Sequence, residues 1–160
     1  MTGDEFSERI IGMMQTLYRV SYSQLPQSCD RDDAVQECLY KAWKKRRQLK
    51  DERTMQTWVI RILINECRNI QKRSGRELAL DELPEREAPP SADHELHDAL
   101  LEIDEKLRLP MLLHYIEGYS TNEVAKILRL PSGTVKSRMS RARRELQKIL
   151  NWEGTEPCGM

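Results

Sequence analysis

The sequence is 160 residues long, with 39% apolar and 32% charged side chains and a formal net charge of zero. That length suits one domain or two small ones, and the apolar content argues against a chain that is disordered throughout. No apolar run approaches the roughly 18 residues that a membrane span needs, and the acidic N-terminus lacks the basic-then-apolar order of a signal peptide. We therefore expect a soluble, cytoplasmic protein without membrane insertion.

The zero net charge hides three blocks of charge. Residues 1–76 carry 15 basic and 10 acidic side chains, residues 77–105 carry 1 and 11, and residues 106–150 carry 10 and 3. Basic blocks favour polyanionic partners, and an acidic block between them is typical of a linker.

Three amphipathic helices are predicted in the first basic block. The first spans about residues 4–24, where apolar side chains recur every three or four residues. The second follows Asp30, begins with carboxylates and ends with a basic run; Trp43 belongs to its apolar stripe. The third runs from about Thr54 to Arg73. Three such stripes can close a bundle over residues 1–73, with Trp43 and Trp58 in its core.

The third predicted helix also has a polar face. Spacings of four, three, one and three place five amide and basic side chains on one side of the helix. These are Arg61, Asn65, Arg68, Asn69 and Lys72.

Residues 74–94 interrupt the helical pattern with Gly75, three prolines and many carboxylates. We interpret them as a flexible acidic linker. The predicted fold is therefore all-α, with two small helical domains joined by this linker. The expected divisions are 1–74, a linker over 75–94, a second domain over 95–151 and a tail over 152–160.

The second domain contains the sharpest local signal. Ser120 with Glu123 predicts a capping box, a short helix then reaches Leu128, a turn follows, and a longer helix runs from Gly133 to Lys148. Two helices joined by a tight turn are the helix-turn-helix pattern.

The last predicted helix is divided chemically. Val135, Met139, Ala142 and Leu146 form its inward stripe. Its start favours phosphate, and small hydroxyls between long cations suit a helix in the major groove. A basic helix alone is often only a solvated face, but the capped helix and turn before it favour nucleic-acid binding. The candidate residues are Gly133, Thr134, Lys136, Ser137, Ser140, Arg141 and Arg144.

Several segments together resemble one protein family. Leu109–Ser120, Glu123–Leu128 and Gly133–Arg143 look like the C-terminal domain of extracytoplasmic-function sigma factors, the minimal two-domain bacterial transcription initiation factors. Asp33–Trp43 resembles their polymerase-binding helix, and Thr57–Asn65 resembles their promoter-melting segment. The resemblance covers nearly the whole chain, in the right order.

The resemblance implies three sets of site residues. The last helix would read the minus-thirty-five element through the seven residues given above. The polymerase-docking set is Asp33, Gln36, Glu37 and Leu39. At the minus-ten element, the Lys50–Trp58 loop and Asn65 would capture a flipped base. The minus-ten set consists of Trp58, Arg61, Asn65, Arg68, Asn69 and Lys72.

The resemblance also implies what the protein does. It would be a bacterial sigma factor that binds core RNA polymerase and promoter DNA, directs transcription initiation and catalyses no reaction itself, so it needs no cofactor. Its control would be stress or envelope responsive, through an anti-sigma factor that can hold it at the membrane. The linker would run toward the RNA exit path. Apart from the resemblance, we hypothesise from its charge that the carboxylates of the linker repel competing DNA.

Besides Cys38, which stands where a small residue is more usual, two positions depart from the family pattern. Arg129 stands in the turn before the last helix, where the family usually has glycine, and a left-handed residue with a side chain costs on the order of 1 kcal/mol. Met55 stands where an aromatic residue is common, and Gln56 follows it. Base preference at the minus-ten element is therefore the least transferable property.

Other patterns point elsewhere but are weaker. Cys29, Cys38, Cys67 and Cys158 form no close pair, which argues against a zinc or disulfide framework. Asp93–Asp98 contains two histidines but no further ligand pattern, so a solvated helix start is favoured over a metal site. Two alternative functions stay open here: a DNA-binding regulator that uses only the 95–150 unit, and a helical adaptor that binds only protein.

Overall fold

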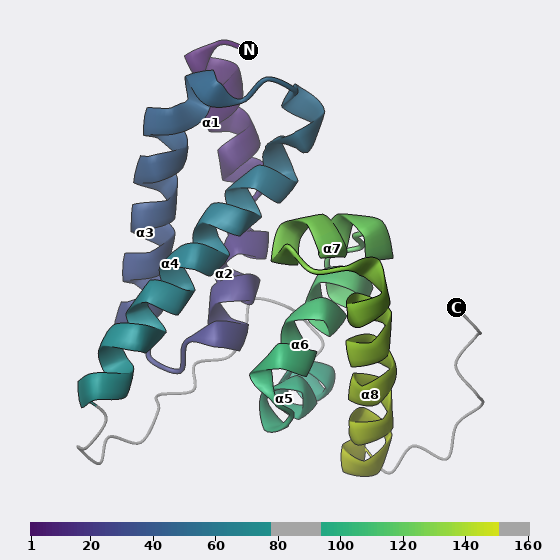
Figure 1. Ribbon diagram of the computed structural model, residues 1–160. Coiled ribbons are helices and arrows are strands. Elements are labelled where there is room, and N and C mark those ends of the chain that lie inside the picture. Colours follow the sequence, from purple (N-terminus) through teal and green to yellow (C-terminus); the bar gives the residue numbers. More distant parts are fainter. Residues whose placement is uncertain (78–93, 151–160) are drawn as a thin grey trace.

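The computed structural model describes residues 1–77 and 94–150 of the chain (Figure 1). Within those ranges every regular element is a helix and no strand occurs. The all-α prediction is therefore confirmed. Residues 78–93 of the expected linker and the expected tail from residue 152 lie outside the described residues.

The N-terminal half is a bundle of four α-helices. They are α1 (Gly3–Gly12), α2 (Met14–Gln24), α3 (Ser28–Lys45) and α4 (Met55–Glu77), with two short 3-10 turns, η1 (Arg46–Gln48) and η2 (Glu52–Thr54), between α3 and α4. Helices α3 and α4 lie side by side, and α2 packs against both (Figure 1). The apolar stripes meet in a core that includes Leu17, Val35 and Leu63, all fully buried.

The single helix expected over residues 4–24 is wrong, because the chain breaks at Met13. There the backbone has φ −96° and ψ −4°, and the N–H of Met13 donates to the carbonyl of Ile10 at 2.9 Å. Gly12 precedes the break, and glycine weakens a helix interior. Apolar periodicity continues through the break, so the spacing alone could not reveal it.

The expected core position of Trp43 is also wrong, because 44% of this residue is exposed. Its indole lies over the first turn of α1, where a Cβ on Gly3 would come within 3.1 Å of the ring. The edge of Phe6 and the guanidinium of Arg46 contact the same ring. Helix α1 therefore covers Trp43 only in part.

The C-terminal half contains α5 (His94–Glu102), α6 (Glu105–Met111), η3 (Leu112–Ile116), α7 (Thr121–Leu128) and α8 (Ser132–Leu150), and η3 is a single π turn. Helix α8 packs against α5, α6 and α7. Leu112, Val124 and Met139 are fully buried among them.

The two halves pack directly against each other. Helix α2 contacts α5 and α6, and α4 contacts α7 (Figure 1). The helix α4 continues through Gly75 to Glu77, past the start expected for the linker. Candidate interfaces on each half are therefore positioned relative to the other.

Candidate nucleic-acid and protein interfaces

Helix α8 presents a cationic and hydroxyl face to solvent. Its apolar stripe of Val135, Met139, Ala142 and Leu146 is buried, as expected. Of the seven residues predicted on the opposite side, six are exposed and Thr134 is half-buried. The exposed ones are Gly133, Lys136, Ser137, Ser140, Arg141 and Arg144.

The start of α8 is fixed by the turn that follows α7. Ser120 caps α7 by accepting the backbone N–H of Glu123 at 3.1 Å, which is one half of the predicted capping box. The Glu123 carboxylate accepts a hydrogen bond from the Ser120 hydroxyl at 3.2 Å. Arg129 ends α7 in the left-handed region, with φ 55° and ψ 47°. The N–H of Leu130 then donates to the carbonyl of Ala125 at 3.0 Å. This turn brings α8 back against α7.

Helix α4 carries the second predicted face. Asn65, Arg68, Asn69 and Lys72 are exposed on it, whereas Trp58 and Arg61 are half-buried. At 1.5 Å per residue, the stretch from residue 58 to residue 72 extends over about 21 Å. The structure thus brings amides and cations together along one side of α4, as their spacing predicted.

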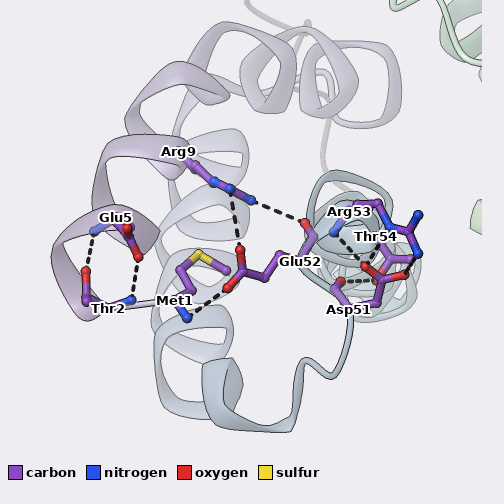
Figure 2. Close-up of polar contacts among 8 residues, drawn as sticks. All are labelled: Met1, Thr2, Glu5, Arg9, Asp51, Glu52, Arg53 and Thr54. Atoms are coloured by element: carbon purple, nitrogen blue, oxygen red, sulfur yellow. Dashed lines mark hydrogen bonds and ion pairs between the residues drawn. The ribbon is translucent and has the colours of Figure 1, made fainter.

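The loop that leads into α4 is held by short-range polar contacts, drawn in Figure 2. Asp51 accepts the backbone N–H of Arg53 at 3.0 Å, and the Thr54 hydroxyl donates to the Asp51 carbonyl at 2.7 Å. The hydrogen bonds from Arg53 lower the pKa of the Asp51 carboxyl. From α1, Arg9 donates to the backbone carbonyl of Glu52 at 3.3 Å, which fixes the loop against the bundle (Figure 2).

Helix α3 carries the third predicted face. Asp33, Gln36 and Glu37 are exposed, and Leu39 is half-buried. Tyr40, which is 59% exposed, continues this face together with Trp43. Tyr40 was not among the residues predicted for this face, although its spacing of three and four from Glu37 and Gln36 places it on the same side of the helix.

An ion-pair network joins α3 to α4. The Lys41 ammonium donates to the carboxylate of Glu66, which is only 7% exposed, and lies 3.8 Å from Glu37. The hydrogen bond to Glu66 raises the pKa of Lys41. Glu37 belongs to the predicted docking set and Glu66 neighbours Asn65, so the network connects two candidate faces. Nothing in the sequence pairs residues 41 and 66.

A second network joins the two halves. Arg19 on α2 binds Glu117, just after η3, with Nε–Oε1 at 2.6 Å and Nη2–Oε2 at 3.0 Å. Thr16 donates its hydroxyl to the same carboxylate at 2.8 Å. The hydrogen bond to Glu117 raises the pKa of Arg19. We call Thr16, Arg19 and Glu117 the clasp; no sequence pattern predicted it.

The sequence predicted neither a metal site nor a membrane-spanning helix. Within residues 1–77 and 94–150, no group of three or more histidine, cysteine or acidic side chains is placed to hold a metal ion. None of the helices over the same ranges has the length and apolarity that crossing a bilayer requires.

Comparison with known families accounts for both halves. The model for sigma-70 region 2 matches residues 12–77, and the model for sigma-70 region 4 matches residues 93–146. The chain belongs to the extracytoplasmic-function family of RNA polymerase sigma factors. The predicted resemblance and the predicted function in directing transcription initiation are thereby confirmed. A match to region 2 over the first half argues against both alternatives that the sequence left open.

Individual relatives agree with this family. This chain is 28% identical over 147 residues to the ECF RNA polymerase sigma factor SigM of Mycobacterium tuberculosis. The match covers 87% of this chain and 74% of SigM. It is 26% identical over 168 residues to the factor SigW of Bacillus subtilis, covering 92% and 89%.

A solved structure shows the same fold. The sigma factor RpoE of Bartonella quintana, crystallised with the anti-sigma factor NepR, matches with a TM-score of 0.81 and 25% identity. The match covers 94% of this chain and 99% of the RpoE chain. A structure of CnrH in complex with the cytosolic domain of CnrY matches with a TM-score of 0.72.

Each candidate face lies within one of the two matched sigma regions. The faces on α3 and α4 lie in the region 2 match, and the face on α8 lies in the region 4 match. Within the clasp of this sigma factor, Arg19 belongs to the first match and Glu117 to the second. The clasp therefore joins the two sigma regions.

Proposed function

We propose that this sigma factor uses three separate helix faces for three contacts. Helix α3 docks on core RNA polymerase, α4 binds the minus-ten element, and α8 reads the minus-thirty-five element within a helix-turn-helix. The observation that carries the proposal is that the predicted polar sets lie on three different helices, each mainly exposed. In this proposal the sigma factor acts in the cytoplasm and catalyses no reaction itself. Its first domain ends near residue 74, and its second domain begins near residue 95.

The face on α8 has the properties that duplex readout requires. Phosphate contacts from basic side chains give affinity, and contacts to base edges give sequence discrimination. Lys136 and Arg141 flank the exposed hydroxyls of Ser137 and Ser140. The short hydroxyls allow the helix axis to approach the groove, where the long cations reach bases or phosphates.

The face on α4 suits an opened strand. Single-stranded nucleic acid is held by cations along its backbone and by pockets or stacking surfaces for its bases. Arg68 and Lys72 are exposed beside the amides of Asn65 and Asn69. The half-buried Trp58 lies at the end of α4 that receives the fixed loop.

The face on α3 suits a protein partner. Exposed carboxylates and an amide lie beside Tyr40 and Trp43, and aromatic side chains are enriched at protein interfaces. This composition differs from the cationic faces of α4 and α8, which supports docking on polymerase rather than on DNA.

We further propose that an anti-sigma factor controls the protein. The RpoE structure that matches most of this chain was crystallised with the anti-sigma factor NepR. An inducing stress would release the sigma factor, and a membrane-bound anti-sigma factor would hold it at the membrane until then.

Run-off transcription tests the proposal. The purified protein is added to bacterial core polymerase with genomic fragments, and the new 5′ ends are sequenced. We expect discrete start sites that share two upstream motifs. Asn65→Ala should reduce strand opening and Lys136→Ala should reduce duplex binding, whereas Glu8→Gln, at an exposed position on α1, should change neither. Absence of new start sites together with no retention by core polymerase would refute the proposal.

A further inference from the structure

A cavity of about 390 Å³ lies where residues of α4, α6 and α8 come together. Its wall includes Arg68 and Gln71 on α4, Lys106 on α6, Arg138 on α8 and the last residue of α2, Gln24. Small-molecule sites in proteins have volumes of about 300–1,000 Å³. The cavity therefore has room for a small ligand, whereas a nucleic-acid duplex is too wide to enter it.

The cationic side chains of this cavity are uncommitted. Arg68 and Lys106 are exposed, and Arg138 is half-buried. Within residues 1–77 and 94–150, the side chains of these three residues form no ion pair and donate no hydrogen bond. The carboxylate of Glu105 also lines the cavity, but it accepts a hydrogen bond from the Gln71 amide at 2.8 Å. The excess of positive charge favours a ligand with at least two negative charges.

A second cavity provides a contrast. It has a volume of about 240 Å³ and is lined by Arg31 and Arg108. Arg31 donates to the backbone carbonyls of Leu25 and Pro26 at 3.1 and 2.9 Å. Arg108 donates to several backbone carbonyls, including that of Ser23. The arginines of the second cavity are therefore used by the fold, whereas those of the 390 Å³ cavity are available to a ligand.

The rest of the wall of the larger cavity suits a nucleoside. Leu109, Pro110 and Leu128 supply apolar surface. Gln24 is only 6% exposed, and its amide nitrogen donates to the Ser23 hydroxyl at 3.3 Å. The side-chain oxygen of Gln24 accepts no hydrogen bond from any described residue. A buried acceptor without a donor is costly, and a base offers both an apolar face and N–H groups at its edge.

We propose that this cavity binds a nucleoside di- or triphosphate. Arg68, Lys106 and Arg138 hold the phosphates, and the apolar wall with Gln24 receives the base. A guanidinium group donates to two phosphate oxygens at once, and an ammonium group binds as a compact charge. The site requires neither promoter DNA nor core polymerase, so it is separate from the three proposed contacts.

Nucleotide binding would have a consequence for the α4 face. Arg68 belongs both to the cavity and to the residues proposed for the minus-ten element. A bound nucleotide and an opened DNA strand would therefore compete for its guanidinium. This consequence, unlike the site itself, rests on the proposed function of α4.

Isothermal titration calorimetry of the full chain tests the phosphate contacts. ATP, ADP, AMP and adenosine are titrated separately without Mg²⁺, which would otherwise compete for the phosphates. We expect ATP and ADP to bind with a Kd below about 1 mM, AMP to bind more weakly and adenosine to give no signal. Lys106→Ala and Arg138→Ala should each weaken ATP binding by about tenfold, as expected for the loss of one charge-assisted hydrogen bond. Lys148→Ala, with an equal charge change outside the cavity, should leave it unchanged.

Pyrophosphate tests the contacts to the base. It should bind more weakly than ADP, because it cannot use the apolar wall or Gln24. Gln24→Met removes the buried acceptor at similar volume, so it should weaken ATP binding and leave pyrophosphate binding unchanged. Circular dichroism checks that each variant is folded, and the comparison of ADP with pyrophosphate in the parent needs no variant. Equal affinities of ADP and pyrophosphate would overturn the recognition of a nucleoside.

A single-stranded oligonucleotide separates this site from DNA binding. Its sequence is the non-template strand of a promoter found by run-off transcription, and saturating ATP should weaken its binding to the parent. Unchanged binding would overturn the competition at Arg68. If Lys106→Ala weakens the oligonucleotide as much as ATP, the cations serve DNA and the nucleotide site is overturned.

The site and the proposed function can fail separately. No binding of ATP, or an equal loss of ATP binding in Lys148→Ala, would overturn the site. Specific ATP binding by a protein that gives no start sites would leave the site standing and refute the proposed function.

Discussion

At the scale of single residues, Arg129 adopts a conformation that its side chain disfavours. It is left-handed at φ 55°, and this costs a residue with a Cβ on the order of 1 kcal/mol. We predict that Arg129→Gly raises stability by up to about 1 kcal/mol, or about 2–4 °C in Tm for a chain of this size. Thermal unfolding followed by circular dichroism measures the change.

The matched control for that prediction is Lys126→Gly. Lys126 is exposed within α7, where a helical glycine costs about 1 kcal/mol. The two substitutions remove the same charge but should shift Tm in opposite directions. If both lower it equally, the left-handed turn carries no strain.

The buried carboxylate of Glu66 supports a second residue-scale prediction. Lys41→Met removes its ammonium partner and should destabilise the protein by about 1–2 kcal/mol, a moderate value because a third of the Lys41 side chain stays in water. Adding Glu66→Gln should recover most of the loss, since no buried charge then lacks a partner. Urea unfolding of the parent, single and double variants tests this, and a double variant as unstable as the single would contradict it.

At the scale of elements, α8 combines a buried stripe with a cationic face. We predict that Lys136→Ala and Arg141→Ala each weaken binding to duplex DNA and reduce the salt slope by about one. Lys148→Ala, exposed near the end of the same helix, is the control with an equal charge change. Fluorescence anisotropy across a salt series measures both effects, and an equal loss for Lys148→Ala would show a general charge effect instead.

On the same helix, the carboxylate of Glu145 competes with DNA phosphates for the side chain of Arg141. Glu145 lies 3.7 Å from the guanidinium of Arg141, one turn along α8. Because a phosphate must replace that carboxylate, Glu145→Gln should strengthen duplex binding modestly. The anisotropy series used for α8 measures it, and weaker binding would mean that Glu145 instead orients Arg141.

Helix faces were the most predictable feature of this protein. The stripes of α3, α4 and α8 were foreseen because burial on one side imposes a 3.6-residue period. The break at Met13 was not, because local backbone geometry leaves that period intact. Trp43 was wrongly predicted to lie in the core. Its position in the apolar stripe shows which side of α3 it occupies, but not how much of the indole the neighbouring helix α1 covers.

At the scale of the whole molecule, the acidic block of the sequence should act through its charge. We predict that neutralising Asp81, Glu82, Glu85 and Glu87 raises promoter-independent DNA binding by the free protein, because repulsion of phosphate is lost. The increase should shrink at high salt, where such interactions are screened. An unchanged affinity at low salt would refute this role.

The contacts between the halves could not have been predicted from the sequence. The clasp pairs residues almost one hundred positions apart, and Arg19 and Glu117 each look like ordinary surface charges in their own helical segments. The candidate faces were predictable because each lies on one helix. Their mutual placement was not, since it depends on which charges meet after both halves have formed.

The long separation between Arg19 and Glu117 also has a consequence for synthesis. The N-terminal half ends at residue 77, forty residues before Glu117. At about 5–20 residues per second, translation needs about 2–8 s to cover that interval. During that interval the growing chain already contains Thr16 and Arg19 but lacks Glu117, so the clasp cannot form.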